Sequence, residues 1–313
     1  MTTHTILVGY DGFDHHEQLP ELAATLARHL EARLRVVHVL PPLPADAWSS
    51  SRVSNAELSE SLREHRRATL EALLEPLQAS GLEVSSTLRE GVPHVELIRE
   101  AVARAADLVI VVDEVSYREG GRSFGATTMK LLRDCPCPVL ATRSRGGMSY
   151  RRIMAAVDIG PDGAPENLPN RAILEMAIRL ARSADTEGAE LVILHAWSLW
   201  AEQTLKWRGE LSDAEMDELR TEAERLQRER LEALLARHPM DDVAHRVVLS
   251  KGAPDAVIPV AVVEEQIDLL VMGTVARTGI PGLVIGNTAE RILNGLVCSV
   301  LTVKPDGFVT PVV

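Results

Sequence analysis

The stretch from Gly273 to Thr288 holds the residues best suited to binding chemistry. It follows a strand-like run at 268–272, is rich in glycine, and ends in Gly286, Asn287 and Thr288. In the next segment, apolar residues recur at helical spacing: Ala289, Ile292, Leu293 and Leu296. Asn287 and Thr288 directly before it are expected to cap this helix. Backbone N–H groups of such a loop and the N-terminus of such a helix can hold a phosphate. The stretch predicts a phosphate cradle, although glycine loops also serve turns alone.

Asp158 is a second candidate for binding. It follows a predicted strand at 153–157, at the carboxyl edge where ligands bind in open α/β sheets. The alternative is that its carboxylate accepts backbone N–H bonds in the next turn, as aspartate often does. Asp11 has the same position after a strand at 5–10, and for it we favour the structural interpretation.

Other reactive side chains show no catalytic or metal-binding spacing. His38 and His195 lie at the ends of predicted strands, without the Ser/Asp or Cys/His spacing of a triad or a metal site, so we expect packed, hydrogen-bonded imidazoles. Cys135 and Cys137 flank a proline, and we interpret both as small hydrophobes rather than redox or metal groups. The sequence predicts no metal and no enzyme.

Composition excludes several kinds of partner. The chain has 313 residues, a net charge of −12 and no basic block, which argues against nucleic acid. Its apolar runs are too short to span a bilayer, and residues 1–10 lack the features of a secretory signal. Three cysteines do not form a disulfide framework, so we expect a reducing, cytoplasmic location.

Strands and helices alternate along the chain, as in a parallel sheet covered by helices on both faces. The first half predicts strands at 5–10, 34–40, 82–88, 107–112 and 138–142. The linker 143–152 interrupts the pattern, which then restarts with strands at 153–157, 191–196, 244–249, 268–272 and 298–303. Between them lie amphipathic helices, including long charged ones at 55–77 and 212–238.

The two halves are copies of one α/β unit. Aligning Gly91 with Gly252 brings further pairs into register without gaps: Pro93/Pro254, Asp107/Asp268, Gly125/Gly286, Thr127/Thr288 and Cys137/Cys298. A consistent set of this length indicates an internal duplication. We therefore predict domains at 1–145 and 150–305, with a tail at 306–313.

The duplicated unit resembles the universal stress protein family in its tandem, UspE-like form. That family's nucleotide motif is Gly, two residues, Gly, nine residues, Gly, then Ser or Thr, and Gly273 and Gly286 fit its spacing. The phrases MGT, RTGIPGL, GNTAE and KPDGFVTPV are similar to the tandem members. The resemblance covers essentially the whole chain. It implies two tandem five-stranded, parallel-sheet domains of the Rossmann-like, adenine nucleotide alpha hydrolase-like kind.

By the same resemblance, Asp158 would line an adenine or ribose pocket, and the phosphates would meet Gly273, Ala276, Gly286, Asn287 and Thr288. Two of these depart from the motif, because Ala276 replaces the second glycine and Asn287 the Ser or Thr. In the first half Val112 and Val115 replace both leading glycines, and branched side chains there disfavour a phosphate. We expect ATP, if bound, in the second domain and none in the first.

Three functions follow from the residues and the resemblance. The first is a cytoplasmic, non-catalytic stress-response protein that binds a ligand or partners. The second is an ATP-binding switch, with or without slow hydrolysis, that uses the second domain alone. The third is a binder of an apolar small ligand. We also expect the terminal strands 138–142 and 299–303 to pair within the chain as a pseudo-dimer, with a homodimer as a further alternative.

Overall fold

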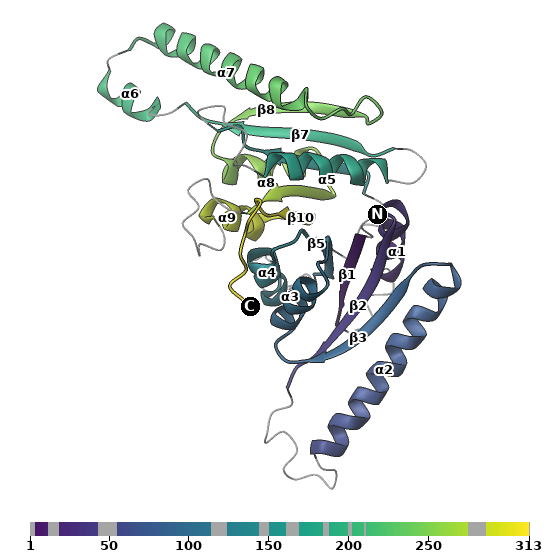
Figure 1. Cartoon of the computed structure of the whole chain (residues 1–313). Helices are drawn as coiled ribbons and strands as arrows, with labels where there is room; N and C mark the ends of the chain where they lie inside the picture. Colours follow the sequence, from purple (N-terminus) through teal and green to yellow (C-terminus); the bar gives the residue numbers. More distant parts are fainter. Residues whose placement is uncertain are drawn as a thin grey trace. The chain divides into compact units, whose positions relative to one another are not determined.

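Alternating strands and helices make up both halves of the computed structural model (Figure 1). The structure describes residues 4–11, 19–42, 55–113, 124–143, 150–160, 169–183, 188–199, 202–209, 211–274 and 286–312. Two compact units are formed, one by Met1–Ser149 with Ser299–Val313 and the other by Tyr150–Cys298.

The first unit contains β1 (His4–Tyr10), α1 (Leu19–His29), β2 (Ala32–Leu40), α2 (Asn55–Ala79), β3 (Val84–Glu90), α3 (Pro93–Ala103), β4 (Leu108–Val112), α4 (Ala126–Asp134), β5 (Val139–Thr142) and β10 (Ser299–Val303). Its strands lie in the order β3-β2-β1-β4-β5-β10, and the first five are parallel. The central strand β4 is almost wholly buried, which explains its continuous apolar sequence. Figure 1 shows α2 running beside β3.

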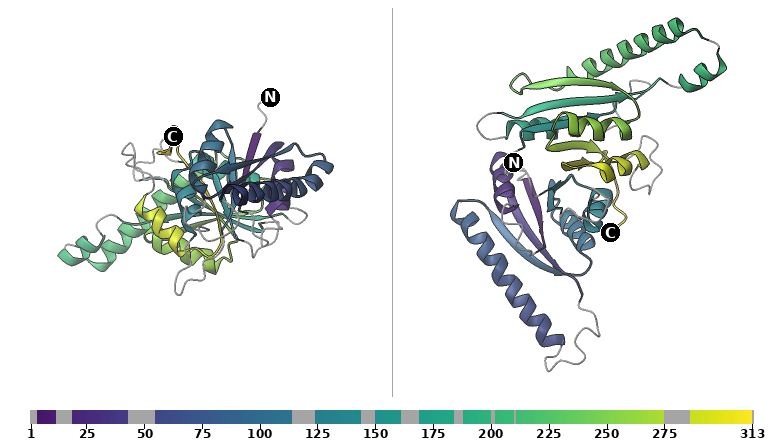
Figure 2. Two further views of the ribbon diagram at one scale, coloured as in Figure 1. Left: turned by 90° about the horizontal axis from the view of Figure 1, so that it is seen from below. Right: turned by 180° about the vertical axis from the view of Figure 1, so that it is seen from behind.

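The second unit contains β6 (Arg152–Val157), α5 (Asn170–Arg182), β7 (Glu190–Trp197), α6 (Glu202–Arg208), α7 (Asp213–Leu235), β8 (His245–Lys251), α8 (Pro254–Glu264), β9 (Leu269–Gly273) and α9 (Asn287–Gly295). Its strands pair in parallel in the order β9-β6-β7-β8. The long helix α7 runs alongside β7 and β8 (Figures 1 and 2). Its N-terminus has the expected capping box between Ser212 and Glu215.

The last strand of the second repeat completes the sheet of the first unit. β10 pairs antiparallel with β5, with Leu301 opposite Leu140 and Thr302 opposite Val139. All five residues of β10 are buried. This ladder confirms the predicted pairing of the two terminal strands within the chain, and it covers an edge of β5 that would otherwise offer unpaired backbone groups.

A buried carboxylate in the first unit gathers three arginines. Glu100 on α3 accepts hydrogen bonds from Arg35 (2.7 Å), Arg104 (3.2 Å) and Arg89. Burial alone would raise the pKa of Glu100, but the hydrogen bonds from Arg89, Arg35 and Arg104 lower it to about 2. The aligned residue of the second unit is Ala261, which is also buried. The Glu100 cluster therefore ties α3 to β2 and β3.

The described ranges hold neither a membrane-spanning helix nor a metal-binding cluster of side chains. Every helix there is too short or too polar to cross a membrane. In the same part of the chain, His, Cys, Asp and Glu do not gather in threes that could hold a metal ion.

Candidate functional site

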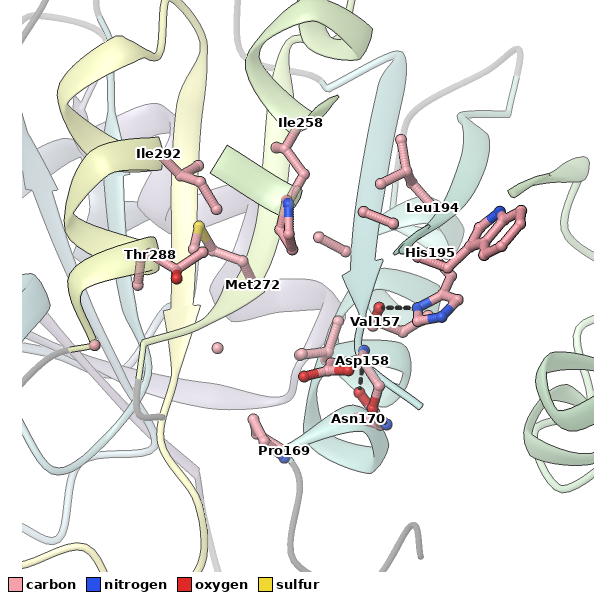
Figure 3. A pocket seen from close by; sticks show the side chains of 18 of the residues that line it. Val157, Asp158, Pro169, Asn170, Leu194, His195, Ile258, Met272, Thr288 and Ile292 are labelled. Atoms are coloured by element: carbon pink, nitrogen blue, oxygen red, sulfur yellow. Dashed lines mark hydrogen bonds between the residues drawn. The ribbon is translucent and has the colours of Figure 1, made fainter. Parts of the chain in front are cut away.

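A pocket of about 570 Å³ opens at the carboxyl ends of β6, β7 and β9 (Figure 3). This is the edge at which open α/β sheets bind ligands, and the volume lies within the range of small-molecule sites. Both sequence candidates, the aspartate after β6 and the start of α9, reach it. Its lining comprises residues 156–158, 160, 169, 170, 173, 194–198, 227, 252, 254, 258, 272–274, 286–289 and 292.

Asp158 lies in the pocket and also organises the turn behind it. Its carboxylate accepts a hydrogen bond from the Gly160 amide at 3.2 Å. Asn170, the first residue of α5, accepts from the Asp158 amide at 2.9 Å and donates to its carbonyl at 2.6 Å. The two interpretations of Asp158 are therefore compatible, because the turn fixes a carboxylate that still lines the pocket. Asn170 belongs to no recognisable sequence motif, so its hydrogen bonds to Asp158 become apparent only in the structure.

Gly273 is required by its neighbour in the fold. A Cβ atom built at this position would lie 2.6 Å from Cγ of Pro169, which precedes α5. Real Cβ atoms do not approach carbon so closely, so any side chain at residue 273 must displace Pro169. The glycine is therefore explained by close packing between β9 and the start of α5, whatever ligand the pocket takes.

Gly286, Asn287 and Thr288 form the start of α9 beside the pocket. The predicted cap is wrong, because Gly286 is the N-cap residue and no side chain caps the helix; Asn287 and Thr288 are its first two helical residues. The Gly286 amide donates to the Thr274 carbonyl at 2.9 Å, which holds the loop ends together. Backbone N–H groups of a first helical turn lack intrahelical acceptors and favour an anion. Ala276 lies outside the described residues.

His195 is a packed, hydrogen-bonded group at the pocket wall, as the sequence predicts. Its Nδ1 lies 3.1 Å from the Val157 carbonyl (Figure 3), and its Nε2 lies 3.2 Å from Oε1 of Gln227 on α7. Burial lowers the pKa of His195, although the hydrogen bonds to Val157 and Gln227 oppose this. The imidazole is therefore neutral at physiological pH and brings no positive charge to the pocket.

Acid should destabilise the second unit through His195. Its pKa is lowered in the folded state, so the unfolded chain binds the proton more readily, and stability is lost as the pH falls below about 6.5. The slope for one histidine is at most about 1.4 kcal/mol per pH unit. Urea unfolding followed by tryptophan fluorescence should show this loss in the wild-type chain and a flatter profile in His195→Gln. A variant of His38, in the first unit, should leave the second unit's profile unchanged.

The pocket is mainly apolar and carries little charge. Ile173, Leu194, Ile258, Met272 and Ile292 form much of its wall, and Figure 3 shows several of these side chains facing the same space. Among the described lining residues, Asp158 is the one with a formal charge. A ligand in this pocket would contact apolar side chains, the Asp158 carboxylate and the first turn of α9.

Comparisons with known proteins match both repeats. The universal stress protein family profile matches residues 2–143 and again 149–304. The chain belongs to the universal stress protein family. It is 27% identical to universal stress protein E of Salmonella typhi over 220 residues, which is 70% of this chain and 68% of that protein. It is 25% identical to the universal stress protein E homolog of Haemophilus influenzae over 280 residues, 88% of each chain.

Solved structures of the family agree with the fold. A putative universal stress protein from Pseudomonas aeruginosa has a TM-score of 0.70 and 25% identity, with 97% of this chain and 94% of that chain covered. One from Archaeoglobus fulgidus has a TM-score of 0.64 over 97% of this chain and 99% of that chain, at 16% identity. The tandem, Rossmann-like universal stress protein architecture is thereby confirmed.

The first repeat of this universal stress protein carries a carboxylate where the second has a threonine. Asp113 aligns with Thr274, and its Oδ1 accepts a hydrogen bond from the Gly125 amide at 2.8 Å. Arg143 lies 3.8 Å from its Oδ2 and stacks over the Phe124 ring at 4.1 Å. A buried carboxylate beside the loop amide disfavours a phosphate at this position, and the absence of ATP from this repeat stays a prediction. Val115 lies outside the described residues.

Proposed function

We propose that this universal stress protein is a non-catalytic, cytoplasmic stress-response protein that binds a small ligand through its second repeat, residues 150–305. The observation that carries the proposal is the pocket at the carboxyl edge of β6, β7 and β9. It combines an apolar wall with a fixed carboxylate and the N-terminus of α9, the combination typical of ligand sites.

We expect no hydrolysis through a side-chain nucleophile, because the imidazole of His195 in the pocket is already engaged. Both ring nitrogens of His195 face protein groups, the Val157 carbonyl and the Gln227 amide. Within the described residues, no Ser, Thr or Cys side chain is hydrogen-bonded to this imidazole, so it has no nucleophile to activate. Phosphate release from ATP above the rate of the buffer blank would support the switch with slow hydrolysis instead.

Adenine nucleotide is the first ligand to test, and we expect it to bind weakly. The described lining offers no lysine or arginine, so phosphates would gain chiefly from the α9 N-terminus, about 0.3–1 kcal/mol. ATP with Mg²⁺ should therefore bind no more than about fivefold tighter than adenosine in calorimetry. Gly286→Val and Asp158→Ala should abolish the binding of both, whereas Asp113→Asn in the first repeat should not change it.

Two outcomes would contradict this assignment. If calorimetry at high protein concentration detects no binding heat for ATP or for adenosine, adenine nucleotides are not ligands of this pocket. A preference for ATP over adenosine of about a hundredfold or more would mean strong phosphate contacts from outside the described part of the chain. Because the wall is largely apolar, an apolar small molecule is the second candidate. Native mass spectrometry of gently purified protein, searching for a co-purifying compound, tests that candidate directly.

A further inference from the structure

Two thiols lie in contact in the first unit. Cys135 is the C-cap residue of α4, and Cys137 follows one proline later, just before β5. Their sulfur atoms are 3.5 Å apart. Cys135 is buried and Cys137 is of intermediate exposure, so Cys137 is the residue of the pair that lies nearer to solvent. Neither residue lines the pocket of the second unit, and the pair has no part in the function proposed above.

A buried lysine supplies positive charge near this pair. Lys304 follows β10, and its Nζ donates to the Leu132 carbonyl in the last turn of α4 at 2.7 Å. The same ammonium lies 5.1 Å from the Phe308 ring centroid, a cation–π distance. Burial lowers the pKa of Lys304 to about 8, and the nearby Cys135 and Asp134 oppose that lowering. The lysine therefore remains largely charged at neutral pH.

The two thiols and the lysine favour a thiolate. The hydrogen bond from Cys137 lowers the pKa of Cys135, burial opposes the effect, and the charge of Lys304 adds to it. The same hydrogen bond and burial raise the pKa of Cys137, with the Cys135 charge as a further cause. When the pair loses its first proton, that proton therefore comes from Cys135, and the second stays on Cys137, as between strongly interacting groups. A thiolate beside a second thiol is the arrangement that thiol–disulfide exchange needs.

The duplication provides an internal comparison. Cys135, Pro136 and Cys137 align with Leu296, Val297 and Cys298, and Lys304 has its counterpart in Arg143. Cys298 is buried and lacks an adjacent cysteine in the sequence. The second repeat therefore folds with one cysteine where the first repeat has the pair.

We propose that Cys135 and Cys137 form a reversible dithiol–disulfide site that exchanges with small disulfides such as oxidised glutathione. When Cys135 is a thiolate, it takes the proton of Cys137 as the Cys137 sulfur attacks the glutathione disulfide, which forms a mixed disulfide and releases one glutathione thiolate. That thiolate takes the proton from Cys135, whose sulfur attacks Cys137 and releases the second glutathione. The protein pair is oxidised by two electrons, and one glutathione disulfide is reduced to one thiol and one thiolate, which takes a proton from water.

The test uses the full-length chain with its three cysteines. Reduced protein is incubated with oxidised glutathione, denatured, treated with N-ethylmaleimide and weighed by intact mass spectrometry. We expect one thiol to remain reactive with the maleimide, with no glutathione attached, and all three to return after dithiothreitol. Peptide mapping should place the new bond between Cys135 and Cys137.

Matched variants separate this site from general oxidation. Cys298→Ser should still lose both remaining thiols, whereas Cys137→Ser should form no internal disulfide. The proposal is overturned if the wild-type chain keeps three reactive thiols or stops at a glutathione adduct. It is equally overturned if Cys137→Ser loses two thiols as the wild type does. Circular dichroism of each variant before oxidation verifies that it is folded.

Discussion

Replacing Glu100 with glutamine is expected to destabilise the first unit by about 3 kcal/mol. The side chain of Glu100 is fully buried, and its carboxylate holds the guanidinium groups of Arg35 and Arg89 together with that of Arg104. Glutamine keeps the volume but removes the charge, so the arginines face one another across a neutral amide. Breaking one partner of a buried ionic cluster costs about 3–5 kcal/mol. We expect the lower end of this range because the side chains of Arg89 and Arg104 are partly exposed to solvent.

The second unit supplies the control for this measurement. Glu190→Gln removes one of the two carboxylates that contact Arg246, the one at 2.8 Å, but both of these side chains are about one-third exposed. Such a pair contributes about 1 kcal/mol or less. Hydrogen exchange of β1, β2 and β4 under native conditions reports the stability of the first unit separately. Equal losses in the two variants would mean that the Glu100 cluster is no stronger than a surface ion pair.

Replacing Gly273 with valine, the residue at the aligned position 112, should close the pocket of the second unit and abolish ligand binding. Its Cβ would overlap Cγ of Pro169, and two further methyl groups would crowd the same space. Overpacking of this kind costs about 1–3 kcal/mol or more. The loss should appear as a lower urea midpoint for the second unit, together with the disappearance of any adenosine heat.

A double-mutant cycle tests the cause of this effect. Gly273→Ala alone should destabilise the second unit, because Cγ of Pro169 lies 2.6 Å from the new methyl group. In a Pro169→Ala background that atom is absent, and the same change should cost about 1 kcal/mol less. If the two changes prove additive, Gly273 is needed for another reason, such as close approach of a phosphate. Binding measured on the double variant then distinguishes packing from ligand contact.

The sequence predicted the α/β class because apolar runs and amphipathic helices alternate strictly, and the repeat fixed which residues are equivalent. It placed β3 and β8 within about two residues of their positions, since strand ends depend on pairing as well as on composition. Asp158 and the start of α9 were found because each directly follows or precedes a recognisable element.

The residues that sequence reasoning missed act through contacts between distant segments. The need for glycine at position 273 comes from its contact with Pro169, which lies far away in the sequence. Asn170 and Gln227 reach the pocket from α5 and α7 with no local signal. Asp113 in the first repeat aligns with Thr274 in the second, directly after a strand in each. The alignment of the repeats could have indicated this added carboxylate. The cap of α9 was misassigned because Asn and Thr favour both N-cap and first-turn positions.

The end of the chain returns to the first unit, so the second unit is inserted between β5 and β10. A protease that cuts only the connection after β5 would leave two pieces held by the β5–β10 ladder and by the Lys304 contact with α4. Dividing the gene at the repeat boundary would instead deprive the first half of its outermost strand. The two repeats are equivalent in sequence pattern, yet the first unit is built from two separate segments of the chain and the second from one continuous segment.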